Sequence, residues 1–520
     1  MIFLQHLCSV FADFWRQSPA LFYGLASLIG CSLSLHRSWV VLLFSLPLFL
    51  LLPLTITGQR RRQVIVRSLL ALTLAIASFG LTNIRYTFPD NILIKGGVAD
   101  IDVISVSRMK TPFGPVWSYK GNLRSFVHDG RIAGKGLPVQ LSIPYNRENE
   151  RPLAGVRYKI PASLKTTTQG RYVLSSIKGE AWKPVEDLNG LAELRSAAKF
   201  RLTEYLKNSI KDPHTGAFLA GIVTGEFDDR FLSFELGRFG LQHLMAISGL
   251  HFSIFSGLFG FCLFLCFPRK VGSIVLIILM TGYFLFLGDS PSVTRSWLAI
   301  VIALGAVAIG RRSVALNSLG MGLLLIVLLE PLSINEIGFQ FSFGVTASIL
   351  LWFSPCSDLL QKIFPKRTLS EVLTMDRWDQ HAYCLLHWLK QALALGVAVN
   401  MVALPLTLYH FHKFPFMALV YNLFFPPLVT ISMFLLILGL VCSSLVPWVG
   451  DQLHHLNESY TGFLLNTASH LPKIFDTAVW RVDSFQSEIL LIYLFLIFGG
   501  GIVCRHRIPQ QEPWMIRPFA

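Results

Sequence analysis

The segment GLQHLMAISGLHFSIF, residues 240–255, carries polar side chains inside an apolar run. Ser248 and His251 are three residues apart and share one face of a helix, where a hydroxyl and an imidazole form a conceivable nucleophile and base. No acidic residue is present in this segment to orient the imidazole. A serine in a membrane helix bonds more often to a backbone carbonyl, and His243 or His251 can serve as a helix–helix contact. Hydrolysis and structural bracing both stay open, and Gly249 leaves a notch that also lets the helix break.

Further polar residues lie in three apolar stretches downstream. They are Asp289, Ser290, Ser292 and Arg295 in GDSPSVTRSW, Gln340 and Ser342 in GFQFSFG, and Asn422 in YNLFFPPLV. An ionisable group at the membrane centre costs roughly 2.5–3.5 kcal/mol, so several of them indicate interior partners or a water-filled path. Arg295 is always charged and is the best candidate for contact with a phosphate, although Asp289 can instead pair with it. Lining a path and bracing the helices remain alternatives for each residue.

The elements that must position these side chains are membrane-spanning helices. Of the 520 residues, 53% are hydrophobic and only 14% are charged, which argues against an ordinary soluble enzyme and indicates a polytopic α-helical membrane protein. Apolar runs of sufficient length predict about eleven spans. They lie near 20–36, 39–57, 66–83, 242–267, 271–288, 293–310, 314–330, 337–354, 387–409, 416–445 and 486–504.

The formal net charge of +15 fits either a nucleic-acid partner or basic cytoplasmic loops. Basic clusters follow the second, fourth, sixth and eighth predicted spans, which identifies one side of the membrane as the cytoplasm. They are Arg60 to Arg62, Arg269 with Lys270, Arg311 with Arg312, and Lys362, Lys366 and Arg367. With this orientation the polar stretch 84–235 is extracytoplasmic. The run 416–445 contains Pro426 and Pro427 and is either one long span or a broken re-entrant pair, so the side of the C-terminus stays open.

Hydropathy divides the chain into five parts. We expect a three-span N-terminal anchor (1–83), an extracytoplasmic, OB-like β domain (84–187), an amphipathic helix with an interfacial segment (188–235), a transmembrane bundle (236–504) and a short tail (505–520).

The polar insert has two characters. The segments ADIDV, VQLSI, GVRYKI and RYVLSS alternate with period two between turns rich in Gly and Pro, which predicts a small β-barrel or sandwich. From 188 to 210 apolar residues recur every three or four positions, which predicts an amphipathic helix on the barrel or on the membrane surface. The apolar segment 213–226 is too short to span and suits a re-entrant or interfacial piece.

Basic and aromatic side chains are interleaved in the β-rich segment. Rings stack on bases and cations bind phosphates, so this combination is what a single strand of nucleic acid needs. The alternative is that the rings form the core and the basic excess is a solvated face. The candidates for DNA contact are Arg108, Lys110, Tyr119, Lys120, Arg124, Phe126, Arg157, Tyr158, Lys159, Arg171 and Tyr172.

Neither a cofactor nor a metal is expected. The eight cysteines are scattered and form no Cys-x-x-Cys, so they make neither a disulfide framework nor a zinc site. No Gly-x-x-x-x-Gly-Lys-Ser/Thr motif occurs, so we expect no ATP-driven step within this chain. The first apolar run lacks a small-residue cleavage site, and we interpret it as a retained span and not a signal peptide.

Four motifs occur in order within residues 215–430: QHLMAISGLHFSIFSGL, GDSPSVTRSW, GFQFSFG and YNLFFPPLV. In this order and spacing they closely resemble the ComEC family of competence membrane channels, and HLMAISGLH is the most specific of them. The resemblance implies carriage of transforming DNA across the inner membrane. It also implies an extracytoplasmic OB-fold that touches DNA, which this chain matches in layout more than in residues.

Many members of that family continue into a metallo-β-lactamase-like domain after the bundle. No His-x-His-x-Asp-His cluster occurs in this sequence, and HFHKF at 410–414 lacks the aspartate. Without that ligand set there is no metal-activated water, so we expect a form without this domain, in which a separate protein degrades the strand that is not imported.

These observations predict a non-enzymatic channel in the bacterial inner membrane that takes up single-stranded transforming DNA during natural competence. The residues that would line or brace the path are His243, Ser248, Gly249, His251, Asp289, Arg295, Gln340, Ser342 and Asn422. By resemblance, the partners are single-stranded DNA, membrane lipid, a periplasmic DNA receptor, a separate nuclease and a cytoplasmic helicase or single-strand-binding protein, and the channel can be an oligomer.

Three rival functions remain. A small-molecule or ion transporter predicts inverted repeats and a charge-matched site near mid-membrane, and we find neither. An intramembrane hydrolase would depend on Ser248 and His251. A structural anchor for other uptake proteins would tolerate every polar substitution named above.

Overall fold

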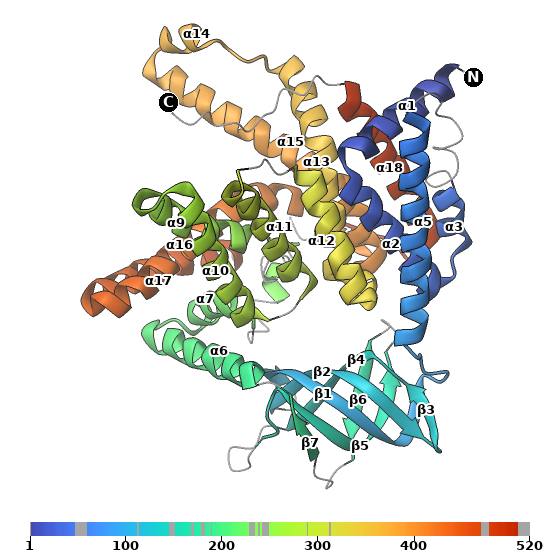
Figure 1. Ribbon diagram of the computed structural model, residues 1–520. Helices are drawn as coiled ribbons and strands as arrows, with labels where there is room; N and C mark the ends of the chain where they lie inside the picture. Colours follow the sequence, from blue (N-terminus) through green and yellow to red (C-terminus); the bar gives the residue numbers. More distant parts are fainter. Residues whose placement is uncertain are drawn as a thin grey trace. The chain divides into compact units, whose positions relative to one another are not determined.

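The computed structural model describes residues 2–46, 60–111, 114–144, 151–167, 171–177, 182–188, 190–227, 234–237, 240–241, 249–288, 290–310, 314–469 and 478–507 (Figure 1). Two compact units emerge from the contacts between residues. Unit 1 comprises residues 1–79, 298–424 and 478–520, and unit 2 comprises 80–297 and 425–477. The bundle predicted over 236–504 is therefore divided between two units, and the N-terminal anchor belongs to the first.

Unit 1 is built from helices and one short β-ribbon. Its elements are α1 (Ile2–Gln17), α2 (Pro19–His36), α3 (Trp39–Leu46), most of α5 (Arg60–Arg85), α12 (Ala315–Leu329), the 3-10 helix η3 (Pro331–Asn335), α13 (Ile337–Ile363), α14 (Leu369–Leu373), α15 (Arg377–Phe411), β8 (Lys413–Pro415), β9 (Val479–Arg481) and α18 (Ser487–Arg507).

Unit 2 joins a β-barrel to a second group of helices. Its elements are β1 (Leu93–Thr111), β2 (Gly114–His128), β3 (Arg131–Gly134), β4 (Leu137–Pro144), β5 (Val156–Thr166), β6 (Tyr172–Ser176), β7 (Lys183–Asp187), α6 (Gly190–Ser209), α7 (Pro213–Thr224), α9 (Gly249–Cys266), α10 (Arg269–Leu287) and α17 (Pro447–Ser469). Three of the described helices contribute to both units: α5, α11 (Pro291–Ala308) and α16 (Ala418–Leu445).

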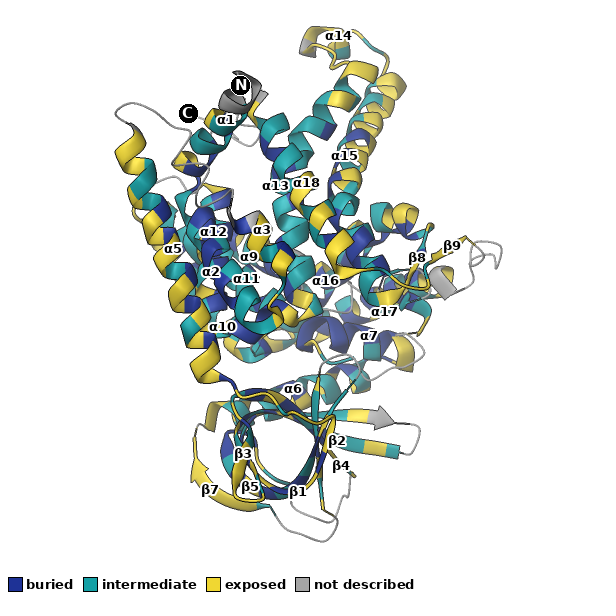
Figure 2. Cartoon of the chain, turned by 90° about the vertical axis from the view of Figure 1, so that its right-hand side faces the viewer, coloured by how far each residue is buried: buried dark blue, intermediate teal, exposed yellow. Residues whose placement is uncertain are grey.

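The chain is a polytopic membrane protein with a β-rich insert. Among the described residues, eight helices are long and apolar enough to cross a membrane, and the apolar helices His251–Cys266 and Ala315–Leu329 are shorter. These ten match ten of the eleven predicted runs; the other, 39–57, lies partly outside the described residues. Helix α5 exposes Leu69, Ile76 and Ile84 along its outer side, as a lipid-facing helix does (Figure 2). Helix α16 continues through Pro426 and Pro427, so the predicted run 416–445 forms a single helix over Ala418–Leu445.

Close backbone approach holds α2 against α12 in unit 1. A Cβ atom at Gly24 would lie 2.7 Å from the Gly320 carbonyl oxygen, and one at Gly320 would overlap the Leu21 backbone. The hydroxyl groups of Ser27 on α2 and Ser78 on α5 lie 2.7 Å apart and share a hydrogen bond. Small residues bring membrane helices together in this way because lipid supplies no hydrophobic drive for helix association.

The insert of unit 2 is a closed five-stranded barrel, seen along its axis in Figure 2. Strand β1 pairs with both β2 and β5, and the ring runs β1-β2-β4-β6-β5 and back to β1. Only β4 and β6 are parallel, and the other pairs in the ring are antiparallel. This order, with one parallel pair, is that of an OB-fold barrel, so the OB-like interpretation of 84–187 agrees with the strand pairing.

Two helices follow the barrel in the chain. The amphipathic helix predicted over 188–210 is α6, and the short apolar segment that follows is α7. Asp212 caps α7, since its Oδ2 accepts from the Thr215 backbone N–H at 2.9 Å. Nearly every side chain of α7 from Thr215 to Thr224 is buried, as in a core helix of a protein interior.

The contact between α2 and α12 predicts a specific sensitivity. We expect Gly320→Ala to lower the free energy of unfolding by about 1–3 kcal/mol, because the added methyl group forces the backbones apart. The measurement is the thermal unfolding midpoint of the full chain in detergent. Gly305→Ala on α11 is the matched control, because a Cβ atom there meets nothing within 4 Å. Equal midpoints for the two variants would contradict the packing described.

Candidate functional site

The structure distributes the predicted path residues over both units. Gly249, His251 and Arg295 belong to unit 2, whereas Gln340, Ser342 and Asn422 belong to unit 1. His243, Ser248 and Asp289 lie outside the described residues. The nucleophile-and-base pair suggested for Ser248 and His251 therefore stays a prediction.

In unit 2, the start of α9 faces the first turns of α11. A Cβ atom at Gly249 would lie 3.2 Å from Nη2 of Arg295, so the Arg295 guanidinium lies in the space that the missing side chain leaves. The same Nη2 lies 3.5 Å from the Ser296 hydroxyl, which itself donates to the Ser292 carbonyl at 2.7 Å. Gly249 is the notch expected from the sequence, and the group beside it is a cation from another helix.

His251 lies on α9 and is only 2% exposed. The same helix packs aromatic rings against α10, with Phe255 stacked on Tyr283 at a centroid distance of 4.2 Å and Phe252 tilted against Tyr283 at 5.1 Å. On the far side of α10, Trp297 of α11 donates to the Thr281 hydroxyl at 3.1 Å. The burial of His251 favours the bracing alternative over direct contact with a water-filled path.

In unit 1, Gln340 connects three elements. Its amide nitrogen donates to the Ile334 carbonyl at 3.0 Å, and its amide oxygen lies 2.7 Å from Nε2 of His410 on α15. The sequence motifs indicate Gln340 but not its partner, because His410 stands out only as part of HFHKF, an incomplete metal motif. The backbone carbonyl of Ser342 accepts from the Thr346 hydroxyl at 2.7 Å.

Asn422 occupies the first turns of α16 and is half-buried. Its Oδ1 is buried and has no hydrogen-bond partner among the described residues. Buried polar groups rarely stay unmatched, so an acceptor in this position marks a place where water or a ligand can bind.

A second polar cluster joins α16 to α17 and was not predicted. Ser432, Asn457 and Thr461 are all fully buried: the Asn457 amide donates to the Ser432 carbonyl at 3.1 Å, and the Thr461 hydroxyl donates to the Ser432 hydroxyl at 2.8 Å. The hydropathy search missed α17 because it is too polar to count as a span. The signal was present in the spacing of His454, Asn457 and Thr461, which places all three on one helical face.

The barrel places three of the predicted DNA-contacting aromatics in its core. Tyr119 and Phe126 are 0% exposed and Tyr158 is 6% exposed. Trp182 packs over two of them, at centroid distances of 4.9 Å from Tyr119 and 5.4 Å from Tyr158. These rings fill the space inside a small barrel and cannot stack on bases, so the alternative that they are core residues is correct.

Two of the predicted cations are neutralised on the outer face of the barrel. Arg157 on β5 donates from Nε to the Asp100 carboxylate at 2.7 Å, and Arg124 on β2 donates from Nε to the Asp102 carboxylate at 2.7 Å. The hydrogen bond from Arg157 holds the pKa of Asp100 below its usual range and raises the pKa of Arg157. Ion pairs of this kind weaken the case for Arg124 and Arg157 as phosphate ligands.

The other predicted contacts differ in accessibility. Lys120, Lys159 and Arg171 are exposed, Arg108 and Tyr172 are half-buried, and the side chain of Lys110 lies outside the described residues. Strand register adds two exposed cations that were not predicted, Lys95 and Lys165. Lys165 pairs with Leu93, two positions before Lys95 on β1. Arg171 directly precedes Tyr172, the partner of Thr166. Lys95, Lys165 and Arg171 therefore gather at one end of the barrel, on neighbouring strands. We call these three residues the cationic end.

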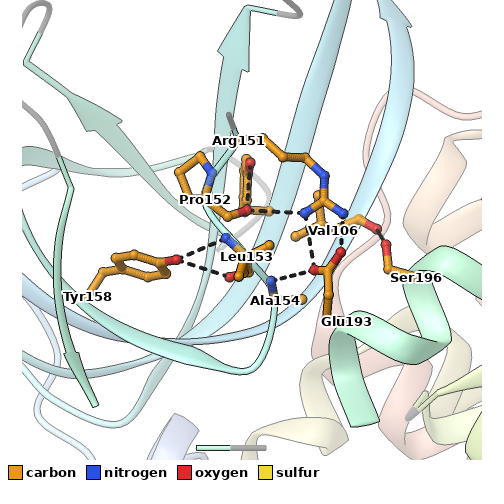
Figure 3. A network of polar contacts seen from close by, with 9 residues as sticks. Val106, Arg151, Pro152, Leu153, Ala154, Tyr158, Glu193 and Ser196 are labelled. Carbon is orange, nitrogen blue, oxygen red and sulfur yellow. Dashed lines mark hydrogen bonds and ion pairs between the residues drawn. The ribbon is translucent and has the colours of Figure 1, made fainter. Parts of the chain in front are cut away.

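A group of polar contacts fixes residues 151–154, which precede β5, to α6 (Figure 3). Arg151 forms a two-pronged ion pair with Glu193, whose Oε2 also accepts from the Ala154 backbone N–H at 2.9 Å. Ser196 donates to the Val106 carbonyl at 2.9 Å, which links α6 to β1 as well. Hydrogen bonds to the barrel backbone thus join the barrel to α6. They fix the orientation of α6 on the barrel more strictly than apolar contacts alone would.

The ion pair between Asp100 and Arg157 predicts a pH-dependent stability. Because the folded pKa of Asp100 is depressed, its contribution is complete near neutral pH and is lost as the pH falls through the folded pKa. We expect Asp100→Asn to lower the opening free energy of β1 and β5 by about 1–3 kcal/mol at neutral pH. The difference from wild type should shrink at about pH 3. Hydrogen–deuterium exchange of the full chain measures both values.

The matched control is Asp129→Asn, which changes an exposed acid in the β2–β3 turn. A difference between Asp100→Asn and wild type that persists unchanged in acid would contradict the assigned cause.

The comparison with known families covers the second half of the chain, which includes parts of both units. The family model described as Competence protein matches residues 232–507. The ComE operon protein 3 of Bacillus subtilis (strain 168) is 25% identical over 295 residues, which is 56% of this chain and 34% of that relative. The match thus spans about a third of the length of the curated relative. No solved structure matches the chain. Since the family model covers more than half of the 520 residues, the chain belongs to the competence protein family.

Proposed function

We propose that this chain is the inner-membrane channel through which single-stranded transforming DNA enters the cytoplasm during natural competence. The observation that carries the proposal is the family match over 232–507. That segment contains the helices on which Arg295, Gln340 and Asn422 lie, so the polar residues of the bundle fall within the family's own region.

The barrel is the first contact for the strand in this proposal. Its support is the OB-like strand order together with the cationic end, where Lys95, Lys165 and Arg171 offer exposed charge to phosphates. Since Tyr119, Phe126 and Tyr158 are core residues, the strand binds through its backbone more than by stacking on these rings. Such binding is insensitive to sequence, as uptake of arbitrary DNA requires.

The helices then carry the strand across the apolar layer. Arg295 in the notch at Gly249 supplies a cation next to a gap in the helix surface, and Asn422 supplies an unmatched acceptor in the other unit. A phosphate that passes Arg295 replaces part of its lost hydration with a charge-assisted hydrogen bond. Gln340 and His251 hold neighbouring helices in place.

The proposal assigns no catalytic step to this chain. A nuclease supplied separately degrades the other strand, and a cytoplasmic helicase or single-strand-binding protein draws the imported strand inward. A periplasmic receptor delivers the DNA. We include these partners because strand degradation, DNA delivery and inward movement each need a protein, and because the family resemblance implies them. Each is part of the proposal.

Entry of labelled DNA into the cytoplasm tests the channel directly. Deletion should stop entry while binding of DNA to the cell surface persists, and Arg295→Gln at matched membrane abundance should lower entry about tenfold. Arg377→Gln, an exposed arginine at the start of α15, is the control and should behave as wild type. Unchanged entry in the deletion strain would reject the channel and favour the transporter alternative.

Salt dependence of binding tests the cationic end separately. Replacing Lys95, Lys165 and Arg171 by Glu should weaken binding of single-stranded DNA to the purified chain and reduce the slope of log K against log salt by about 2. The control replaces three other exposed cations, Lys362, Lys366 and Arg367, by Glu. If both triple variants bind alike, the cationic end is not the receiving site.

A further inference from the structure

A cavity of about 450 Å³ lies between the outer face of β1, helix α6 and the last turn of α10. Its walls are mainly apolar and include Leu188, Leu191, Leu194, Leu285 and Phe286. Its size is in the range of pockets that bind small molecules, roughly 300–1,000 Å³. Neither the barrel nor the channel proposal gives this cavity a role.

The position of the cavity along α10 restricts what can fill it. Helix α10 is one of the candidate spans and ends at Leu287, so Leu285 and Phe286 occupy its last turn. Leu285 is 55% exposed, as is typical of a side chain that faces lipid. The cavity therefore lies at the end of a candidate span, where membrane lipids can reach it.

A β-bulge in β1 holds one cation, Arg195, at the cavity. The register of β1 against β2 shifts between Val103 and Ser105, so Ile104 forms a β-bulge whose carbonyl accepts from Nη2 of Arg195 at 2.7 Å. The Arg195 guanidinium also lies against the end of α10, since a Cβ atom at Gly288 would be 3.1 Å from its Cζ. Arg195 is therefore fixed beside the end of a candidate span, on the wall of the cavity.

One carboxylate oxygen on the same wall lacks a donor. Asp102 lines the cavity, and its Oδ2 accepts from Arg124 at 2.7 Å. Its Oδ1 is buried and has no hydrogen-bond partner among the described residues. Leaving such a group unmatched costs free energy, so the site suits a ligand that brings an N–H donor.

We propose that this cavity binds one phospholipid with an ethanolamine headgroup. The acyl chain lies along the leucines of α6 and α10, the phosphate accepts from Arg195, and the ammonium donates to the Asp102 carboxylate. A choline headgroup has no N–H to donate, and a glycerol headgroup brings no positive charge, so both fit the carboxylate less well. The bound lipid joins the barrel, α6 and the end of a span through one molecule.

The test uses the purified full chain in nanodiscs that contain equal amounts of ethanolamine, choline and glycerol phospholipids. After transfer to detergent, native mass spectrometry measures which lipid stays bound. We expect the ethanolamine lipid to be retained about tenfold over the choline lipid, the effect of one charge-assisted hydrogen bond. Asp102→Asn should remove that preference, while Asp129→Asn should keep it.

Two further variants separate the headgroup from the acyl chain. Leu191→Trp fills the cavity and should lower retention of all three lipids, whereas Ile132→Trp, on an exposed face of β3 that does not line the cavity, should not. Arg195→Gln should weaken all three lipids equally, because each carries a phosphate.

Equal retention of the three lipids by the wild-type chain would overturn the proposal, as would a full ethanolamine preference in Asp102→Asn. If Asp102→Asn fails to fold, the wild-type comparison of ethanolamine with choline decides alone. No DNA enters the experiment, so its outcome is independent of whether the chain is a DNA channel.

Discussion

A hydrogen-bonding side chain inside a membrane helix must find its partner within the protein, because the surrounding lipid offers none. Much of the architecture of this chain follows from that constraint. Gln340 reaches His410, and the Ser348 hydroxyl reaches the Ala398 carbonyl at 2.6 Å, so both bonds join α13 to α15. In unit 2 the same requirement joins α16 to α17 through Ser432. Polar residues that interrupt the apolar runs thus form the hydrogen bonds that join neighbouring helices.

The barrel solves a different problem, since its outer face meets both water and protein. Two β-bulges, at Ile104 on β1 and at Arg124 on β2, change the direction of the chain and turn side chains and carbonyls toward particular partners. One bulge gives Arg195 its acceptor, and the other brings Arg124 to Asp102. The ion pairs that result neutralise Arg124 and Arg157, while Lys95, Lys165 and Arg171 leave exposed charge at one end. Charge distribution on this barrel is therefore a consequence of strand register.

Most elements were predictable because their periodicity is strong. The strands around ADIDV and GVRYKI, the amphipathic α6 and the apolar spans all follow from spacing within one segment. The ring contacts of Tyr119 and the pairing of Arg157 with Asp100 were not, because they depend on strand register between distant segments. Helix α17 was not predicted because its buried face is polar, and a search for apolar runs does not detect such a helix. The partner of Gln340 lies 70 positions away on another helix, and a single sequence holds no record of that distance.

Helices α1 and α18, the first and last in the part of the chain that the structure describes, share one hydrophobic core. Val10, Phe14 and Trp15 of α1 belong to the same buried cluster as Leu351 of α13 and Ile502 of α18. During synthesis α1 leaves the ribosome long before α18 exists, so its inner face must wait in the membrane without its final partner. Unit 1 can reach its native packing only after nearly the whole chain has been made, and by then the barrel has had time to close. The packing of the N-terminal helix therefore depends on a helix that is synthesised almost 500 residues later.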